Sequence, residues 1–151
     1  MRILCLDIGT KRIGIAASDP MGWTAQPVSV IERHRDGREM DEIAKLCEEM
    51  EVKKLIVGMP LDSEGGVGGQ GKKVESYVNH LKRHLAGCGL DIPLELWDER
   101  YSTAVARERL IDADVSRAKR KRVIDKMAAV VILESYLREN EAPEIGEGME
   151  G

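Results

Sequence analysis

An aspartate followed by a turn stands close to the N-terminus, in the stretch LDIGTKRIG at residues 6–14. Asp7 ends an apolar run, and Gly9 permits a tight turn. The turn carries two cations, Lys11 and Arg12. Three kinds of structure use such a stretch: a cradle for nucleotide phosphates, a metal-holding strand of a nuclease, and an ordinary β-hairpin. All three need Asp7 and Gly9, so the rest of the chain has to distinguish them.

Further carboxylates lie beside other apolar segments. Asp98 and Glu99 close the segment IPLELWDE, and Asp125 comes just before the apolar residues 127–133. Carboxylates that converge can bind metal ions, but residues so far apart in sequence meet only if the fold brings them together. The elements that carry them therefore decide whether they act with Asp7.

The apolar pattern predicts five strands, at 2–8, 12–19, 24–32, 53–60 and 92–99. The first two strands pair as an antiparallel hairpin, and Pro27 places the third at an edge or a bulge. Apolar residues at helical spacing predict helices at 39–50, around 74–85, at about 102–111 and at 124–139. A glycine-rich loop at 61–71 precedes the second helix.

This order, a three-stranded meander followed by alternating helices and strands, predicts an α/β fold. Strands that are joined through a helix run parallel, so the first, fourth and fifth strands end at one edge of the sheet. Open α/β sheets bind their ligands at that edge. Asp7 would then lie near Asp98 and Glu99. Asp125 either faces the same edge or complements the dipole at the start of its helix.

Charge is distributed unevenly along the chain. The net charge is −4, but residues 141–151 contain four glutamates and no cation, so residues 1–140 are close to neutral. Within this neutral part, the run RAKRKR at 117–122 places a basic patch just before the helix of Asp125. The tail at 140–151, rich in Glu and Gly, has the composition of a disordered segment.

Length and composition favour one compact cytoplasmic domain. A chain of 151 residues, 42% of them hydrophobic, can bury a substantial core. The apolar runs are too short for a membrane span, and the N-terminus lacks the apolar core of a signal peptide. Three widely spaced cysteines, an odd number, indicate buried or half-buried thiols rather than disulfides or a zinc site.

Four motifs, in their order and spacing, resemble the YqgF/RuvX family: LDIGTKRIGIAASD, IVGMPLDSEGGVGGQGKKVESYV, WDERYSTAVA and RKRVIDKMAAVVILESYL. The likeness covers residues 1–139. The family was first described as a Holliday junction resolvase and is now associated mainly with trimming precursor 16S ribosomal RNA at its 5′ end. The resemblance implies an RNase H-like fold, with a mixed five-stranded sheet flanked by helices, and a nuclease domain at 1–139.

The resemblance also implies a catalytic site of metal-holding acids: Asp7, Asp98, Glu99 and Asp125. Mg²⁺ or Mn²⁺ would be the cofactor, because these hard ions prefer oxygen ligands. Two such ions can activate a water and stabilise the leaving oxygen when a phosphodiester is cleaved. Neighbouring residues on a strand point to opposite faces, so Asp98 and Glu99 do not both reach the metals unless the strand has ended.

Cations near these acids are candidates for contacts with the nucleic-acid backbone: Lys11, Arg12, Arg100, Lys119, Arg120 and Lys121. Backbone contacts position a substrate without reading its bases. The alternative for Lys11 and Arg12 is a solvated turn.

Two other functions, an actin-like ATPase and a non-catalytic nucleic-acid-binding module, are alternatives to a nuclease. An actin-like ATPase needs a second Asp-x-Gly hairpin and a second domain, and this sequence has neither. A non-catalytic nucleic-acid-binding module would not need the acids. The substrate, precursor ribosomal RNA or a four-way DNA junction, is left open. So is the choice between a monomer, which suffices for end trimming, and a homodimer, which suits two symmetric cuts.

Overall fold

The computed structural model describes residues 2–60, 68–98 and 117–141. Its elements follow one another as β1 (Arg2–Ile8), β2 (Arg12–Ser18), β3 (Ala25–Glu32), α1 (Glu39–Glu49), β4 (Val52–Met59), α2 (Gly69–Gly87), β5 (Leu94–Asp98), α4 (Arg117–Tyr136) and the π-helical turn η1 (Leu137–Glu141).

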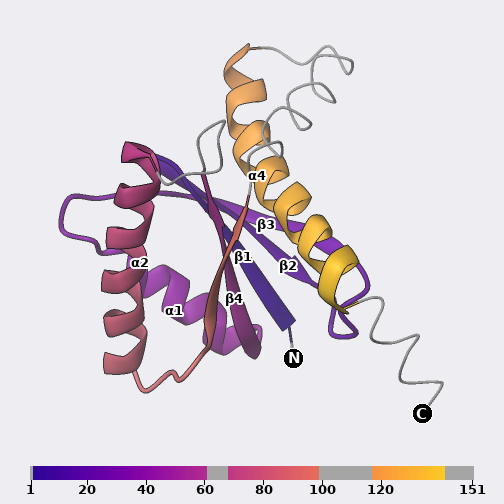
Figure 1. The fold of residues 1–151 in the computed structure, drawn as a ribbon. Helices are drawn as coiled ribbons and strands as arrows, with labels where there is room; N and C mark the ends of the chain where they lie inside the picture. Colours follow the sequence, from indigo (N-terminus) through magenta and orange to yellow (C-terminus); the bar gives the residue numbers. More distant parts are fainter. Residues whose placement is uncertain (1, 61–67, 99–116, 142–151) are drawn as a thin grey trace.

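One mixed sheet organises the chain, with the strand order β3-β2-β1-β4-β5. β1 pairs antiparallel with β2 and parallel with β4, and β5 continues parallel to β4. Helices α1 and α2 cover one face of the sheet and α4 crosses the other (Figure 1). The predicted five-stranded mixed sheet is confirmed, and the ends of β1, β4 and β5 lie at one edge.

Strand alternation divides the interior into two cores. On β1, Leu4, Leu6 and Ile8 belong to the core under α1 and α2. Ile3 and Cys5 belong to the core under α4, and Cys5 is 0% exposed. Because successive side chains on a strand point to opposite faces, any residue of β1 can be assigned to one of the two cores by its position.

Helix α4 begins at Arg117, seven residues before the predicted start at 124. The prediction that the basic run 117–122 precedes this helix is therefore wrong, because the run forms its first turns. Arg, Ala and Lys are strong helix formers, and no Gly or Pro interrupts them. The burial predicted for the apolar segment is confirmed, since Ala129 is 0% exposed and Ile132 is equally buried.

Three smaller predictions have definite outcomes. Pro27 lies on the edge strand β3, beside a shift in its register with β2, as its missing N–H requires. Cys88 is exposed, so the expectation of buried or half-buried thiols fails for it and holds for Cys5 and Cys47. The predicted helix at 102–111 and the acidic tail from residue 142 onward lie outside the described residues.

The helices that the structure describes include none that is both long and apolar enough to cross a membrane.

The turn between β1 and β2 is tightly closed. Gly9 N–H donates to Arg12 O at 2.8 Å, and a Cβ atom on Gly9 would lie 2.9 Å from that same oxygen. Real Cβ atoms essentially never approach a backbone oxygen so closely. The turn therefore requires glycine at this position because of space.

We expect Gly9→Ala to destabilise the protein by about 1–3 kcal/mol, because the backbone of the turn must shift to admit the methyl group. Gly87→Ala is the matched control, since Gly87 lies in the last turn of α2 with no atom near a built Cβ. The control should range from unchanged to about 1 kcal/mol more stable. Urea unfolding of both variants measures the difference, and equal stabilities would contradict the steric argument.

Candidate functional site

Asp7 lies near the carboxyl end of β1, on the face of the sheet that α4 covers. Its position matches those of Ile3 and Cys5, which pack under α4, and its side chain is half-buried. On β2 its direct partner is Gly14. On β4 the residue beside it is Gly58, because the preceding pair is Leu6 with Val57. The positions directly beside Asp7 on the two neighbouring strands are therefore both glycines.

Asp98 ends β5 at the same edge, but on the other face of the sheet. Trp97 packs against the core under α4, and its Nε1 donates to Ser135 Oγ at 3.2 Å. Leu94 packs against the opposite core. By alternation Asp98 shares the face of Leu94, and it is exposed. The structure thus brings Asp7 and Asp98 to one edge without placing them on one face.

The remaining predicted acids are described only in part. Glu99 lies outside the described residues. Asp125 belongs to α4, one helical turn before the buried Ala129, and its side chain lies outside the described part. Helix α4, to which Asp125 belongs, crosses the face of the sheet to which Asp7 belongs (Figure 1).

The predicted substrate-binding cations, like the acids, are only partly within the described residues. Lys11 is exposed in the β1–β2 turn, and Arg12 Nε lies 3.3 Å from Glu32 Oε1 on the neighbouring strand. Arg100 lies outside the described residues. Lys119, Arg120 and Lys121 fall in the first turns of α4, where only the backbone is described.

The predicted metal site draws its acids from β1, the end of β5 and α4. Within 2–60, 68–98 and 117–141, no three described side chains of His, Cys, Asp or Glu lie together as a metal ion requires. Of the four predicted acids, only Asp7 and Asp98 have described side chains. The chemistry of the donor fits, because the Asp7 carboxylate near a strand end offers the oxygen ligands that a hard cation prefers.

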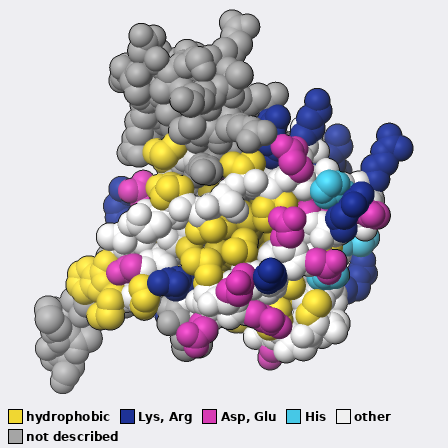
Figure 2. Space-filling model, turned by 180° about the vertical axis from the view of Figure 1, so that it is seen from behind, with side chains coloured by type: hydrophobic (Ala, Val, Ile, Leu, Met, Phe, Trp, Pro, Cys, Tyr) yellow, Lys and Arg dark blue, Asp and Glu magenta, His cyan; other side chains and the backbone are white. Residues whose placement is uncertain are grey.

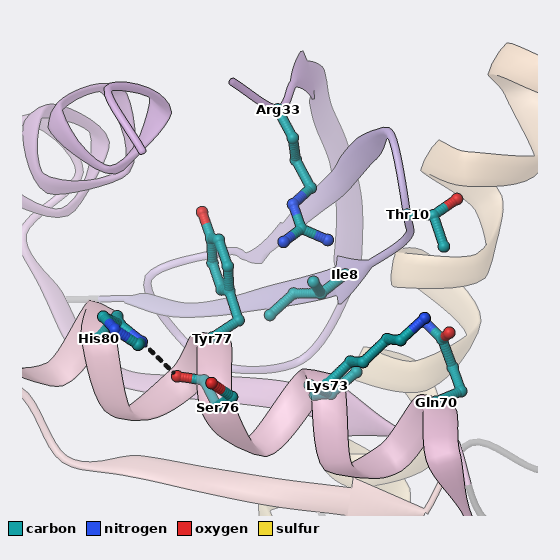
Figure 3. A pocket seen from close by; sticks show the side chains of 9 residues that line it. Ile8, Thr10, Arg33, Gln70, Lys73, Ser76, Tyr77 and His80 are labelled. Carbon is teal, nitrogen blue, oxygen red and sulfur yellow. Dashed lines mark hydrogen bonds between the residues drawn. The ribbon is translucent and has the colours of Figure 1, made fainter. Parts of the chain in front are cut away.

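A second feature, a cavity of about 470 Å³, opens at the same edge on the side of α2. We call it the α2 pocket. It lies between the β1–β2 turn, the end of β3 and the first half of α2 (Figure 3). Its lining residues are mostly polar or cationic: Ile8, Thr10, Arg33, Gln70, Lys73, Val74, Ser76, Tyr77 and His80.

Arg33 is held firmly at this pocket. Its Nη1 donates to Gly9 O at 2.6 Å, and its guanidinium carbon lies 4.6 Å from the centroid of the Tyr77 ring. Its backbone N–H donates to Lys11 O at 2.8 Å. These contacts fix the guanidinium against the β1–β2 turn, and Figure 3 shows it between Tyr77 and Ile8.

A buried carboxylate supports this arrangement from behind. Glu39 is 1% exposed, accepts a hydrogen bond from Tyr77 Oη at 2.7 Å and accepts another from the His34 N–H at 2.9 Å. Burial by itself would raise the pKa of Glu39, but the hydrogen bonds from Tyr77 and His34 outweigh it and lower the pKa below its usual value. Burial, together with the bond to Glu39, raises the pKa of Tyr77.

Sequence reasoning missed the α2 pocket. Two signals in the sequence point to it: the cations clustered in ERHRDGR at 32–38, and the spacing of Lys73, Tyr77 and His80, which places them on one face of a helix. Neither signal reveals that Arg33 meets that helix face, because the contact joins β3 to α2 across some forty residues.

Comparisons with known proteins agree on one family. A family model described as "RuvX: Holliday junction resolvase" matches residues 1–139. A Desulforamulus reducens protein named "Putative pre-16S rRNA nuclease" is 50% identical over 137 residues, which cover 91% of this chain and 96% of that protein. A protein of the same name from Clostridium botulinum is 43% identical over the same shares.

Solved structures resemble the fold at low sequence identity. Thermus thermophilus RuvC in complex with a Holliday junction substrate superposes with a TM-score of 0.54 at 12% identity, over 93% of this chain and 96% of that one. The fowlpox virus Holliday junction resolvase gives 0.55 at 12% identity, over 92% and 99%. These likenesses confirm the RNase H-like fold.

Replacing Glu39 by Gln should destabilise the protein by about 1–3 kcal/mol at neutral pH, because the amide offers only one oxygen to two donors. The lowered pKa of Glu39 means that the unfolded chain takes up its proton first. Its stabilising contribution is complete above the unfolded pKa of about 4.3 and is lost as the pH falls through the lower folded value.

Urea unfolding from neutral pH down through the carboxylate range measures this effect. Wild-type protein should lose more stability over that range than Glu39→Gln does. Parallel pH profiles for the two proteins would contradict the inferred role of the Glu39 charge.

Proposed function

Because this chain belongs to the RuvX family, we propose that it acts in the 5′-end maturation of precursor 16S ribosomal RNA, as a nuclease that hydrolyses phosphodiester bonds. The observation that carries the proposal is the position of Asp7, at the ligand-binding edge of the sheet, on the face of α4 and between two glycines. The cytoplasm is then the compartment where the protein meets its substrate.

We propose that Asp7 and Asp125, with one acid of the 98–99 pair, hold Mg²⁺ or Mn²⁺. When bound, the metal supplies an activated water and stabilises the charge on the leaving oxygen. Asp7 contributes a fixed carboxylate from the central strand. Carboxylates that converge in this way repel one another, so a cation lowers the free energy of bringing them together.

Strand alternation favours Glu99 over Asp98 as the acid that acts with Asp7. Asp98 shares the face of Leu94, which is opposite to the face of Asp7. This placement leaves Glu99 as the acid of the pair that we assign to act with Asp7. Asp98 is then a neighbour of the site rather than a metal ligand.

Cations at the start of α4 would bring the backbone of the substrate to these acids. Lys119, Arg120 and Lys121 lie one to two turns before Asp125 in the same helix, so a strand held there passes close to it. Lys11 and Arg12 approach from the β1–β2 turn and Arg100 from beyond β5. Such contacts hold phosphates without regard to sequence.

A four-way DNA junction is the second candidate substrate, favoured by the description of the matching family model. Junction resolution needs two symmetric cuts and hence a homodimer, whereas end trimming needs one site. A third possibility, binding without cleavage, leaves the acids without a role. Purified protein assayed on precursor RNA and on a four-way junction, with Mg²⁺ and with Mn²⁺, separates the three.

Asp7→Asn should lower the cleavage rate by more than about a hundredfold while the fold stays intact, because the amide keeps the size of the side chain and removes the ligand charge. Glu99→Gln should have a comparable effect. Asp98→Asn is its matched control on the opposite face and should change the rate much less. Cleavage by Asp7→Asn at the wild-type rate, or by wild type in excess chelator, would refute the metal site.

Replacing Lys119, Arg120 and Lys121 together by Ala should weaken substrate binding to a similar extent for unrelated sequences. Each lost phosphate contact should also flatten the log-log salt dependence, by about 0.7 for single strands and 0.9 for duplex DNA. The rate at saturating substrate should change less than the affinity. Unchanged affinity and salt slope would show that these cations are only solvated.

A further inference from the structure

We propose that the α2 pocket binds a backbone phosphate of the same nucleic-acid strand, at least one nucleotide away from the bond that is cleaved. The inference rests on the proposed function, since it takes a nucleic acid as the substrate. It adds a second contact point, on the opposite side of the sheet edge from Asp7, which would fix the path of the strand.

The lining of the pocket suits a phosphate. Arg33 and Lys73 are its cations, and Gln70, Ser76 and Thr10 provide neutral donors. None of its described lining residues is Asp or Glu. His80 Nδ1 lies 2.8 Å from the Ser76 carbonyl oxygen, which can only accept, so Nδ1 carries the proton. The charged groups in the described lining of the pocket are therefore cations, set among neutral polar groups and apolar side chains.

Arg33 is organised for such a ligand before it binds. Only one of the five guanidinium N–H groups is needed for the 2.6 Å bond to Gly9 O, and the planar fork matches the spacing of phosphate oxygens. The Tyr77 ring packs against one face of the Arg33 guanidinium, and the hydrogen bond from Tyr77 Oη to the buried Glu39 fixes the ring. Because Arg33 is already fixed, a ligand does not pay the entropy of ordering it.

A neighbouring cavity of about 710 Å³ shares Arg33, Tyr77 and His80 with the α2 pocket but carries carboxylates. Asp36 Oδ1 lies 3.3 Å from Arg38 Nε, and this ion pair compensates part of the positive charge of the cavity, while Asp41 Oδ1 lies 2.8 Å from His84 Nε2. Figure 2 shows Lys, Arg and His side chains gathered along the margin of the molecule that carries α2. Unlike this neighbouring cavity, the α2 pocket has no carboxylate among its described lining residues, and Glu39 lies behind Tyr77 rather than in that lining.

The pocket and Asp7 are close enough to share one strand. Ile8, which lines the pocket, directly follows Asp7, and neighbouring Cα atoms are about 3.8 Å apart. Their side chains point to opposite faces of the sheet. A strand that crosses the edge at the β1–β2 turn would therefore reach Asp7 on one side and the pocket on the other, and it would pass the exposed Lys11.

A pair of adjacent lysines on α2 tests the proposal. Lys72 and Lys73 are both exposed and carry the same charge, but only Lys73 lines the pocket. The full-length chain is titrated with labelled single-stranded RNA in the presence of a chelator, and binding is measured by fluorescence anisotropy. Lys73→Ala should weaken binding about tenfold and flatten the salt slope by about 0.7, while Lys72→Ala should change the affinity less than about twofold.

Strand length gives a second measurement. RNA shortened one nucleotide at a time should lose its sensitivity to Lys73→Ala at the length where it no longer reaches the pocket. Arg33→Lys, which keeps the charge and loses the fork, should show the same length dependence. Equal losses for Lys72→Ala and Lys73→Ala, or a Lys73 effect at every length, would refute the pocket and leave only general attraction.

Inorganic phosphate and a mononucleotide serve as competitors. If these competitors displace the RNA strand only at concentrations far above that of the strand, the pocket is a subsite for a longer substrate. If the mononucleotide binds as tightly as the strand, the subsite proposal is overturned. Because binding is read without metal, the outcome is independent of cleavage. If the wild-type protein cleaves RNA but Lys72→Ala and Lys73→Ala bind it equally well, the pocket proposal is refuted and the nuclease proposal stands. If only Lys73→Ala weakens binding but the wild-type protein cleaves nothing, the nuclease proposal is refuted and the pocket proposal stands.

Discussion

The pairing of β1 with β2 on one side and β4 on the other is the interaction on which the rest of the structure depends. This pairing places β1 at the centre of the five-stranded sheet, and helices cover both of its faces. Because adjacent side chains of a strand point to opposite faces, Asp7 and Ile8 are assigned to different sides by this pairing alone. The turn that follows, closed by Gly9, is where the two sides of the molecule meet.

Each side then has its own chemistry. On the side of α4, Asp7 offers a carboxylate near the end of the central strand, and the positions directly beside it on β2 and β4 are Gly14 and Gly58. On the side of α2, Arg33 closes against the same turn through Gly9 O and Lys11 O. One turn thus connects an acidic group and a basic pocket, and a polyanion with a bound cation can interact with both.

Burying the Glu39 carboxylate is the main electrostatic cost on the side of α2. A buried charge is tolerated only when hydrogen bonds replace its water, and Tyr77 and His34 provide them. The result joins α1, α2 and the segment after β3 into one unit, with Arg33 stacked on its surface. We infer that this polar cluster fixes the position of the pocket, since apolar packing under α2 does not specify where a guanidinium lies.

The sequence by itself determined the five strands, the amphipathic faces of α1 and α2 and the burial of the segment after Asp125, because these follow from periodicity within one element. It also determined the family, through motifs that cover most of the chain. The start of α4 was misplaced, since a run of cations looks like a boundary although it propagates a helix well. Only the tertiary structure decided that Asp98 lies across the sheet from Asp7, that two glycines flank Asp7, and that Arg33 meets Tyr77. Each of these depends on strand register or on contacts between distant elements, which local patterns do not encode.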